Sequence, residues 1–338
     1  MTRGRPRITG SPARVYPHPI GPWTVASIDR HAQMQWARFD PDSGRCETVD
    51  PRRDPALPAM ELVAASDELI GYRIGRRAVF RSRDRFTKIV RPKRFDRLLH
   101  THHHLNRTLE TNVATPTVTL AVDAGLVELS PVPGRGLHDL LRCGTADDVV
   151  IRAVAAALAA FHSVDPVDQT TRTPDTPSRW ITTVQRQLPE LGPRLQTVAA
   201  RLPTIKPPSP VVTHGDLHDK NILVDRSNGG SPRIGLIDFD GVALGGSEDD
   251  LANLGVHVQL RSLQAGSDVT VAQAQAERLY DAYTSHAALD HERLEQTERH
   301  TWFRLACLYR VRKVNSPKTQ TLFEELLARS LSPTDRLS

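Results

Sequence analysis

The sequence predicts an α+β protein with two lobes: a small N-terminal lobe built on a five-stranded antiparallel sheet with one helix, and a larger, mainly helical C-terminal lobe. Two observations predict this class. Five short runs of strand-forming residues lie between residues 68 and 132, whereas helix-forming segments fill most of the chain after residue 146. The composition, 39% hydrophobic and 25% charged among 338 residues, is typical of a soluble globular protein with ample material for a core.

Residues 1–62 are expected to form a basic lead-in followed by a small appended strand element. The first 22 residues are rich in proline, glycine and arginine, which is typical of a loose segment. Two short strand-like runs follow in residues 23–40, and "PDSG" then predicts a turn into a returning strand, "RCETVD". The prolines of "PRRDPALP" end this element.

Residues 63–130 are expected to form the N-terminal lobe. "YRIG", "RAVFR" and "RFTKIV" predict three short strands with tight connections. "FDRLLHTHHHLNRTLE" predicts a helix, because its leucines recur at roughly helical spacing. "PTVTLAVDAG" and "LVELSPV" predict two more strands, so the helix is inserted after the third strand of the five-stranded sheet.

Residues 131–338 are expected to form the helical C-terminal lobe, with a small hairpin set into it. "ADDVVIRAVAAALAAFHSV" begins with acids, as the helix dipole favours, and continues in helix-forming residues. The hairpin consists of two short strands joined by "DRSNGGSP". From Glu248 onward the sequence predicts helices in "EDDLANLGVHVQL", "VAQAQAERLYDAYTS", "HERLEQTERHTWFRLACLYRVRKV" and "TQTLFEELLARSL".

Charge and cysteine content indicate the compartment and the partners to expect. The net charge is +5, but four arginines and no acid lie in the first fifteen residues, which is typical of a flexible arm and does not predict a nucleic-acid partner. Cys46, Cys143 and Cys307 lie far apart and form no CxxC pair, so a reduced compartment is expected. The longest apolar window is interrupted by Arg152 and is too short to span a bilayer. We therefore expect a cytoplasmic protein without a membrane partner.

The stretch "VVTHGDLHDKNILVD", residues 211–225, places many polar groups between two apolar runs. Buried polar groups must be satisfied, and a site for a metal and a phosphate is one solution. Asp216 and Asn221 are five residues apart, and Asp238 follows a hairpin in "LIDFD". This is the spacing of phosphoryl transfer by kinases, in which one aspartate accepts the hydroxyl proton while an asparagine and a later aspartate bind Mg²⁺. Carboxylate and amide oxygens are ligands suited to Mg²⁺.

"HGDLHDKNIL" followed by "IDFDG" resembles the signature of the aminoglycoside phosphotransferase and choline kinase-like family, which has a protein-kinase-like, two-lobed fold. The resemblance covers roughly residues 65–330. It implies an enzyme that uses ATP (or GTP) and Mg²⁺ to phosphorylate a hydroxyl group. It also implies that Asp216 is the catalytic base, His214 the loop-orienting histidine, and Asn221 and Asp238 the Mg²⁺ ligands. Asp250, in "EDDLANL", resembles the aspartate that supports the catalytic loop.

Three further positions are candidates for nucleotide binding. Lys88, in "RFTKIV", resembles the strand lysine that holds the α- and β-phosphates; Lys93 competes for this role but follows a proline outside the strand. "LVELSPVPGRGLHDLL" resembles the hinge and post-hinge segment, and Glu128 is the nucleotide-binding candidate within it. Arg76 or Arg77, in the turn of "GYRIGRRAVF", could contact a phosphate; the alternative is a plain hairpin with exposed arginines.

The sequence departs from the family pattern in two places. Neither a GxGxxG loop nor a P-loop motif is present. The phosphate-binding lysine normally pairs with a glutamate on the following helix, but Thr101 stands near that position and several histidines surround it. A neutral histidine could accept a hydrogen bond from Lys88, the histidines could form a metal site, or they could be exposed or core-edge residues. These histidines are His100, His102, His103 and His104.

The acceptor is expected to be a small polar molecule with a hydroxyl group. By resemblance, the leading acceptors are an aminoglycoside, another antibiotic or an amino sugar. The resemblance also places Asp240 where the family often has a second acid. Two rival functions stay open. One is a sugar kinase of metabolism, and the other is a nucleotide-binding pseudokinase that regulates a partner, which the missing glutamate and weak glycine loop favour. The sequence leaves the oligomeric state undetermined.

Overall fold

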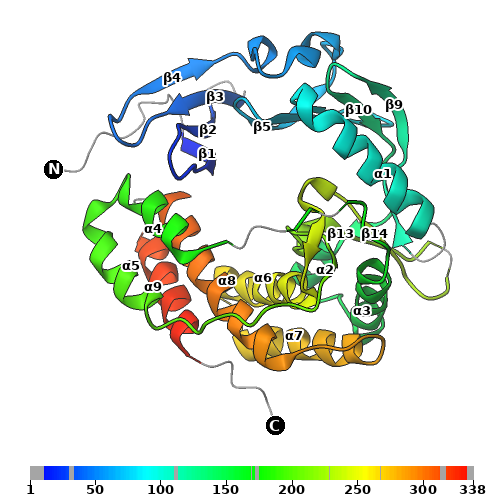
Figure 1. Cartoon of the computed structure of the whole chain (residues 1–338), viewed down its shortest axis with the longest axis vertical. Helices are drawn as coiled ribbons and strands as arrows, with labels where there is room; N and C mark the ends of the chain where they lie inside the picture. The colour runs from blue at the N-terminus through cyan, green and yellow to red at the C-terminus, as the bar shows by residue number, and fades with distance from the viewer. Residues whose placement is uncertain are drawn as a thin grey trace.

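The structure, a computed structural model, describes residues 11–29, 34–109, 113–168, 170–171, 175–227, 229–266, 268–312 and 317–332. The basic first ten residues, predicted to be a flexible arm, lie outside the described residues. Sheets dominate the N-terminal part of the chain and helices the C-terminal part (Figure 1). Across the described residues, none of the helices combines the length and apolar character needed to cross a membrane.

A four-stranded antiparallel sheet begins the described chain. It has the order β1-β2-β3-β4 and consists of β1 (Ser11–Tyr16), β2 (Trp23–Ile28), β3 (Met34–Phe39) and β4 (Cys46–Val49). The prediction of a loose lead-in is wrong for residues 11–16, because β1 pairs with β2 up to the Tyr16–Thr24 partners. Non-local strand pairing and burial of Val15 outweigh the proline- and glycine-rich composition of this segment.

A second antiparallel sheet carries one long helix. Its five strands have the order β5-β6-β7-β10-β9 and are β5 (Glu68–Arg73), β6 (Arg77–Arg81), β7 (Phe86–Val90), β10 (Leu126–Leu129) and β9 (Val118–Val122). Helix α1 (Phe95–Leu109) follows β7, the central strand. Phe95, Leu98, Leu105 and Leu109 are buried on α1 at the spacing of one helical face, which explains why this segment is a helix packed on the sheet.

The connection from β10 leads into short strands that frame the candidate site. One small sheet contains β11 (Arg135–Gly136), β13 (Ile222–Asp225), β14 (Arg233–Leu236) and β8 (Val113–Ala114), in that order. A second pairs β12 (Val211–Thr213) with β15 (Ala243–Gly245). The helices are α2 (Leu137–Arg142), α3 (Asp148–His162), α4 (Pro177–Gln185), α5 (Gly192–Ala199), α6 (Ser247–Ala265), α7 (Val269–Thr284), α8 (His291–Arg312) and α9 (Pro317–Leu331).

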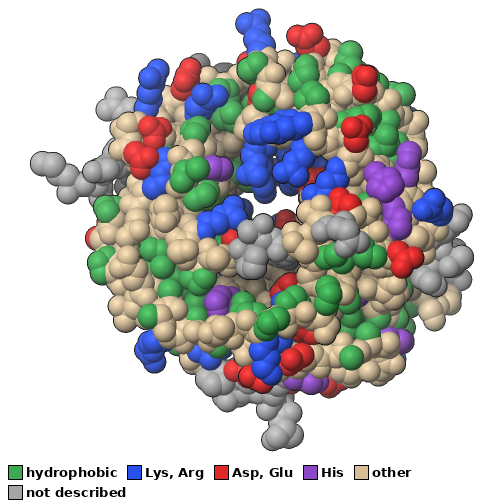
Figure 2. Space-filling model, in the orientation of Figure 1, with side chains coloured by type: hydrophobic (Ala, Val, Ile, Leu, Met, Phe, Trp, Pro, Cys, Tyr) green, Lys and Arg blue, Asp and Glu red, His purple; other side chains and the backbone are tan. Residues whose placement is uncertain are grey.

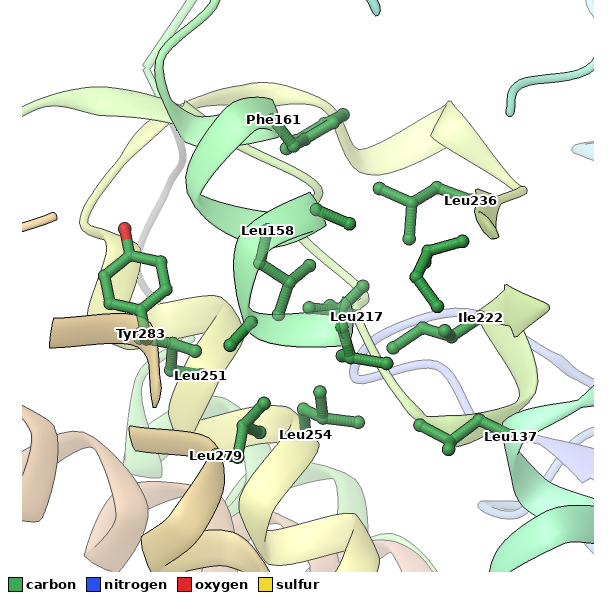
Figure 3. Packing of buried hydrophobic residues seen from close by; sticks show 14 of the residues in the cluster. Leu137, Leu158, Phe161, Leu217, Ile222, Leu236, Leu251, Leu254, Leu279 and Tyr283 are labelled. Atoms are coloured by element: carbon green, nitrogen blue, oxygen red, sulfur yellow. The ribbon is translucent and has the colours of Figure 1, made fainter. Parts of the chain in front are cut away.

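The largest hydrophobic core lies between these short strands and helices α3, α6 and α7. Leu158 and Phe161 of α3 meet Leu251 of α6 and Leu236 of β14 in this core (Figure 3). Leu217 and Ile222 also point into it, one inside the polar stretch and one at its end (Figure 3). The polar residues between them are therefore held at a fixed place on the surface of a close-packed core.

The N-terminal sheet packs on both halves of the molecule. Because side chains alternate across a strand, Trp23 and Val25 of β2 pack with residues of α4, α8 and α9, whereas Ala26 packs with the five-stranded sheet. Polar contacts also reach both sides: the Thr24 hydroxyl accepts from the Ile74 amide at 3.0 Å, and Arg186 of the helical part contacts Asp42 at 2.6 Å. The chain thus forms a ring around a central opening (Figures 1 and 2).

This packing predicts that the N-terminal sheet is needed for stability. The Phe39 side chain is 2% exposed and meets Trp23 edge-on, with 6.0 Å between the ring centroids. Phe39→Ala is expected to lower the free energy of unfolding by about 3 kcal/mol through lost burial and a cavity. Ile28→Ala, in the same sheet but 46% exposed, is the control and should change little. Equal, small losses in urea unfolding would show that the sheet is a dispensable addition.

Candidate active site

The polar loop between β12 and β13 is held in a tight backbone conformation. Gly215 has φ +80°, and a Cβ at this position would lie 2.2 Å from the carbonyl oxygen of Gly241. A side chain here would be strained and would also push apart two chain segments, so the structure requires glycine between His214 and Asp216. The two segments that carry the polar residues, the loop and the 238–242 turn, are therefore in direct backbone contact.

Asp250, at the start of α6, fixes the beginning of this loop. Its carboxylate accepts hydrogen bonds from the backbone amides of His214 at 2.5 Å and Gly215 at 3.0 Å. The ring of His162 also approaches this carboxylate, at 3.3 Å. His214 Nε2 donates to the carbonyl oxygen of Ile237 at 2.9 Å, which links the loop to the next strand end. These contacts bind the loop to the start of α6 and to the residue after β14, and none of them uses the side chain of Asp216.

Asp216 is the exposed acid of the loop. Among the described residues its carboxylate forms no ion pair, and it borders two cavities, one on each side of the loop. The Asn221 side chain donates from Nδ2 to the backbone carbonyl of Asp216 at 3.0 Å. Since this contact uses the amide nitrogen, the amide oxygen of Asn221 is the atom that could ligate a cation.

Lys88 and Arg77 bind a pair of acids in the 238–242 turn. Lys88 Nζ lies 2.8 Å from Asp238 Oδ1 and also contacts Asp240. Arg77 contacts Asp238 at 3.1 Å and Asp240. Burial alone would raise the pKa of Asp238, but Lys88 and Arg77 hold it well below its usual range. Burial alone would lower the pKa of Lys88, but the two acids raise it above its ordinary value.

The backbone of Asp238 is strained where it presents its carboxylate. Its φ is +67°, and it is the one residue other than glycine with positive φ in the part of the chain that the structure describes. Such conformations are costly for residues with a side chain and persist where the surrounding structure imposes them, often at functional sites. Here the strain turns the carboxylate of Asp238 toward Lys88.

The partners of Lys88 explain how the chain manages without a glutamate on α1. The Thr101 hydroxyl is buried and donates to the backbone carbonyl of Arg97 at 2.8 Å, so it does not replace the acid. His102 is 1% exposed, and its ring lies 5.4 Å from the ring of Phe239. Neither ring nitrogen forms a well-aligned hydrogen bond with the described residues. The acids that neutralise Lys88 are thus Asp238 and Asp240.

The histidines of α1 do not form a metal site. No group of three or more His, Cys, Asp or Glu is arranged to hold a metal ion in the segments that the structure describes. His100 stacks on His104, whose Nε2 donates to the carbonyl of Asp165 at 2.8 Å. These two histidines therefore have ordinary surface contacts, and His102 alone faces the interior.

The buried ring of His102 predicts a pH dependence of stability. Burial and the nearby Lys88 lower the pKa of His102 to about 4 in the folded protein. The unfolded state keeps a pKa near 6.5, so it binds the proton preferentially, and the stability that depends on neutral His102 is lost as pH falls from about 6.5 to about 4. Relative to wild type, His102→Leu should gain about 3 kcal/mol of unfolding free energy over that range. Parallel pH profiles of the two proteins in urea unfolding would contradict this assignment.

The other predicted nucleotide-binding residues occupy different surroundings. Arg76 lines the cavity beside Asp216 and has no acid within ion-pair distance among the described residues. The side chain of Glu128, on β10, instead contacts Arg85 at 3.1 Å, away from that cavity. Lys93 is exposed in the turn before α1. The geometry thus brings together Asp216, Asn221, Asp238 and Lys88, leaves Arg76 at the rim and leaves Glu128 in an ion pair.

The residues around Asp238 fit a divalent cation that prefers oxygen ligands. Asp238 and Asp240 offer carboxylate oxygens, and Asn221 offers an amide oxygen; this donor set suits Mg²⁺. Lys88 and Arg77 neutralise the carboxylates here. A bound cation would therefore supply positive charge to carboxylates that already require it.

Sequence reasoning missed a group of arginines that lines the same cavity. Three of them follow β7, in "IVRPKRFDR", and the cavity of about 330 Å³ extends from Asp216 to these side chains. Their spacing of three residues is visible in the sequence and is the signal that could have found them. They are Arg91, Arg94 and Arg97.

The model of the phosphotransferase enzyme family matches residues 73–295. No curated protein matches the chain.

Solved structures with a similar fold include small-molecule kinases. APH(2")-IIia, solved in complex with GDP and kanamycin, has a TM-score of 0.53 and 16% identity, over 79% of this chain and 93% of that one. A choline/ethanolamine kinase family protein from Mesorhizobium loti has a TM-score of 0.50 and 16% identity, over 82% and 92%. The ethanolamine kinase of Plasmodium vivax has a TM-score of 0.50 and 11% identity, over 79% and 82%. At these identities the likeness concerns the fold.

Proposed function

Because the chain belongs to the phosphotransferase enzyme family, we propose that it transfers the γ-phosphoryl group of ATP or GTP, with Mg²⁺, to a hydroxyl of a small polar acceptor. The observation that carries this proposal is the position of Asp216. Its carboxylate has no ion-pair partner among the described residues, stands between two cavities and belongs to the loop that also holds Asn221. A general base needs this freedom, whereas a structural acid would be paired.

Each residue of the site has a separate role in the proposed phosphoryl transfer. Asp216 orients the acceptor hydroxyl and accepts its proton, while the hydroxyl oxygen forms a bond to the γ-phosphorus and the β–γ bridging bond breaks. Lys88 donates hydrogen bonds to the nucleotide phosphates, and Asp238 and Asn221 would hold the metal. When bound, Mg²⁺ neutralises charge on the phosphates. Asp250 keeps the loop in place through the amides of residues 214 and 215.

The division of the chain follows from these roles. We assign nucleotide binding to residues 63–130, with the base of the nucleotide against the hinge that follows β10, and acceptor binding to residues 131–338. We assign residues 1–62 as an appended element, whose described part packs on the helical part through Trp23 and Val25 and on the five-stranded sheet through Ala26. Glu128 lies on β10, next to the hinge, and its side chain is bound to Arg85.

The class of acceptor is the open part of the proposal. APH(2")-IIia binds kanamycin, and this supports an aminoglycoside or another antibiotic as a candidate, which would make the protein a resistance enzyme. An amino sugar and the ethanolamine-type alcohols of the kinases named above are candidates on the same ground. The charge of the residues that line the cavity beside Asp216 favours a different class of acceptor.

The proposed activity is tested with ATP, GTP and Mg²⁺ over a panel of alcohols, amino sugars and antibiotics. Release of ADP or GDP that depends on both acceptor and Mg²⁺ is the expected result. Thermal stabilisation by the nucleotide with Mg²⁺ checks that the nucleotide site is formed. If the nucleotide neither stabilises the protein nor is consumed with any acceptor, the proposed function is wrong.

A further inference from the structure

The cavity beside Asp216 has an unusually basic wall. It lies between the β5–β6 turn, the start of α1 and the 238–242 turn. Figure 2 shows basic side chains gathered around the central opening of the ring. The arginines that line the cavity are Arg73, Arg76, Arg77, Arg91, Arg94 and Arg97.

Most of these arginines have no acid partner among the described residues. Arg77 is neutralised by the acid pair of the 238–242 turn, and Arg97 contacts Asp168 at 3.2 Å. No acid lies within ion-pair distance of the other four arginines over the ranges that the structure describes. The Arg73 guanidinium lies over the ring of Tyr16 at 4.9 Å. Burial, and then Arg73 and Arg91, lower the pKa of Arg76. Like charges held this close indicate a site for an anion.

Two of these arginines, Arg91 and Arg94, lie away from the place where the nucleotide is expected to bind. Strand β7 pairs with β10 so that Phe86 faces Leu129, next to the hinge, and Ile89 faces Leu126. Arg91 follows the opposite end of β7, beyond Lys88, and Arg94 lies one turn further on. A nucleotide with its base at the hinge and its phosphates at Lys88 would leave Arg91 and Arg94 on the far side of the γ-phosphate. Asp216, the proposed base, borders this same space.

Among the described residues, the second cavity that Asp216 borders offers no unpaired acid other than Asp216 itself. It measures about 520 Å³, and the acids that line it besides Asp216 are Asp175 and Asp249. Asp249 is bound to Arg293 at 2.9 Å, and Asp175 accepts from Trp180 Nε1 at 2.8 Å. Lys206, Arg293 and Arg304 lie on the same wall, each of them in an ion pair with acids. Within the part of the chain that the structure describes, neither cavity therefore offers the cluster of unpaired carboxylates that several ammonium groups would need.

We propose that the acceptor carries a phosphate or carboxylate group besides its reactive hydroxyl, and that Arg91 and Arg94 bind this anionic group. The inference rests on the proposed function and names its substrate class. The transfer itself is unchanged: the acceptor hydroxyl gains the phosphoryl group, its proton passes to Asp216, and the nucleoside diphosphate leaves with the electrons of the broken bond. Arginine suits this role because its fork of N–H groups matches a phosphate or carboxylate.

The first test uses inorganic phosphate as the probe. Wild-type protein saturated with a non-hydrolysable ATP analogue and Mg²⁺ should still bind phosphate in calorimetry. Arg94→Gln should weaken that binding about 10- to 100-fold, the loss expected for a charge-assisted contact, and leave the analogue's affinity within about twofold. Arg81→Gln is the matched control, since Arg81 lies on β6 and pairs with Glu68 at 2.6 Å outside the cavity. Phosphate binding that vanishes once the analogue is bound, or that never occurs, would overturn the proposal.

The second test uses matched pairs of acceptors. Glucose and glucose 6-phosphate, glucosamine and glucosamine 6-phosphate, and glycerol and glycerate differ by one anionic group, and kanamycin represents polycations. Nucleotide consumption should favour the anionic member, and Arg94→Gln should raise its KM about tenfold or more with kcat nearly unchanged. Faster turnover of kanamycin or the uncharged members would overturn the inference and leave the proposed function intact. Failure of nucleotide binding in the first test would instead remove the proposed function.

Discussion

Asp216→Asn is expected to lower kcat by about 10²- to 10⁴-fold, because the amide cannot accept the proton of the acceptor hydroxyl. Nucleotide affinity should remain within a few-fold of wild type, since Lys88 and Asp238 are untouched. The structure supports a clean separation of these effects: Asp250 and the backbone of Gly215 hold the loop, and the side chain of Asp216 takes no part. Rates of ADP release and calorimetry with an ATP analogue and Mg²⁺ measure the two quantities.

Asp148→Asn is the control for this experiment, because Asp148 is a surface acid on α3 with its side chain 59% exposed. It should leave kcat and affinity unchanged. If Asp216→Asn keeps turnover within a few-fold of wild type, Asp216 is not the base. If both binding and turnover collapse, the acid is structural instead.

Lys88→Ala is expected to lower kcat/KM by about 10²- to 10³-fold, the scale of losing one preorganised donor to developing charge. The Lys88 side chain is 5% exposed and already points at the acid pair, so little reorganisation is needed when phosphates arrive. Its removal also leaves Asp238 and Asp240 with Arg77 as their remaining ion-pair partner among the described residues, which should weaken nucleotide binding. Steady-state kinetics with ATP and calorimetry measure both effects.

Lys93→Ala provides the matched control, because Lys93 is exposed and lies outside β7. It should change kcat/KM little. Equal losses in the two variants would point to a general effect of positive charge. If Lys88→Ala leaves nucleotide affinity intact and wild type transfers phosphate to no acceptor, a pseudokinase that regulates a partner becomes the better account.

Local sequence pattern predicts much of the chain's secondary structure. The strands around Lys88 were expected as short strand-like runs with tight connections, and the helix that carries Leu98 and Leu105 was expected from its helical spacing; both lie in those segments. Strand β1 was not expected, because its stability comes from pairing with β2 and from burial against distant helices. The closing of the ring by the N-terminal sheet likewise depends on contacts between residues far apart in sequence, which local pattern does not reveal.

The candidate site, too, was predictable from the sequence only in part. The spacing of Asp216, Asn221 and Asp238 could be read in the sequence, since the chemistry requires those residue types at those intervals. The partners of Lys88 could not, because Asp238 is 150 residues away and is aimed by its left-handed backbone conformation. The arginines after β7 were visible as residues, but their convergence with Asp216 on one cavity depends on how α1 packs.

The measurement that tests the central claim most directly is transfer of label from γ-³²P-ATP to a small-molecule acceptor, with the product separated and counted. Wild-type protein with Mg²⁺ should label a hydroxyl compound from the matched panel. Asp216→Asn should label it about 10²- to 10⁴-fold more slowly while still binding the nucleotide. Undiminished labelling by Asp216→Asn, or nucleotide binding by wild type without transfer to any acceptor, would contradict the account.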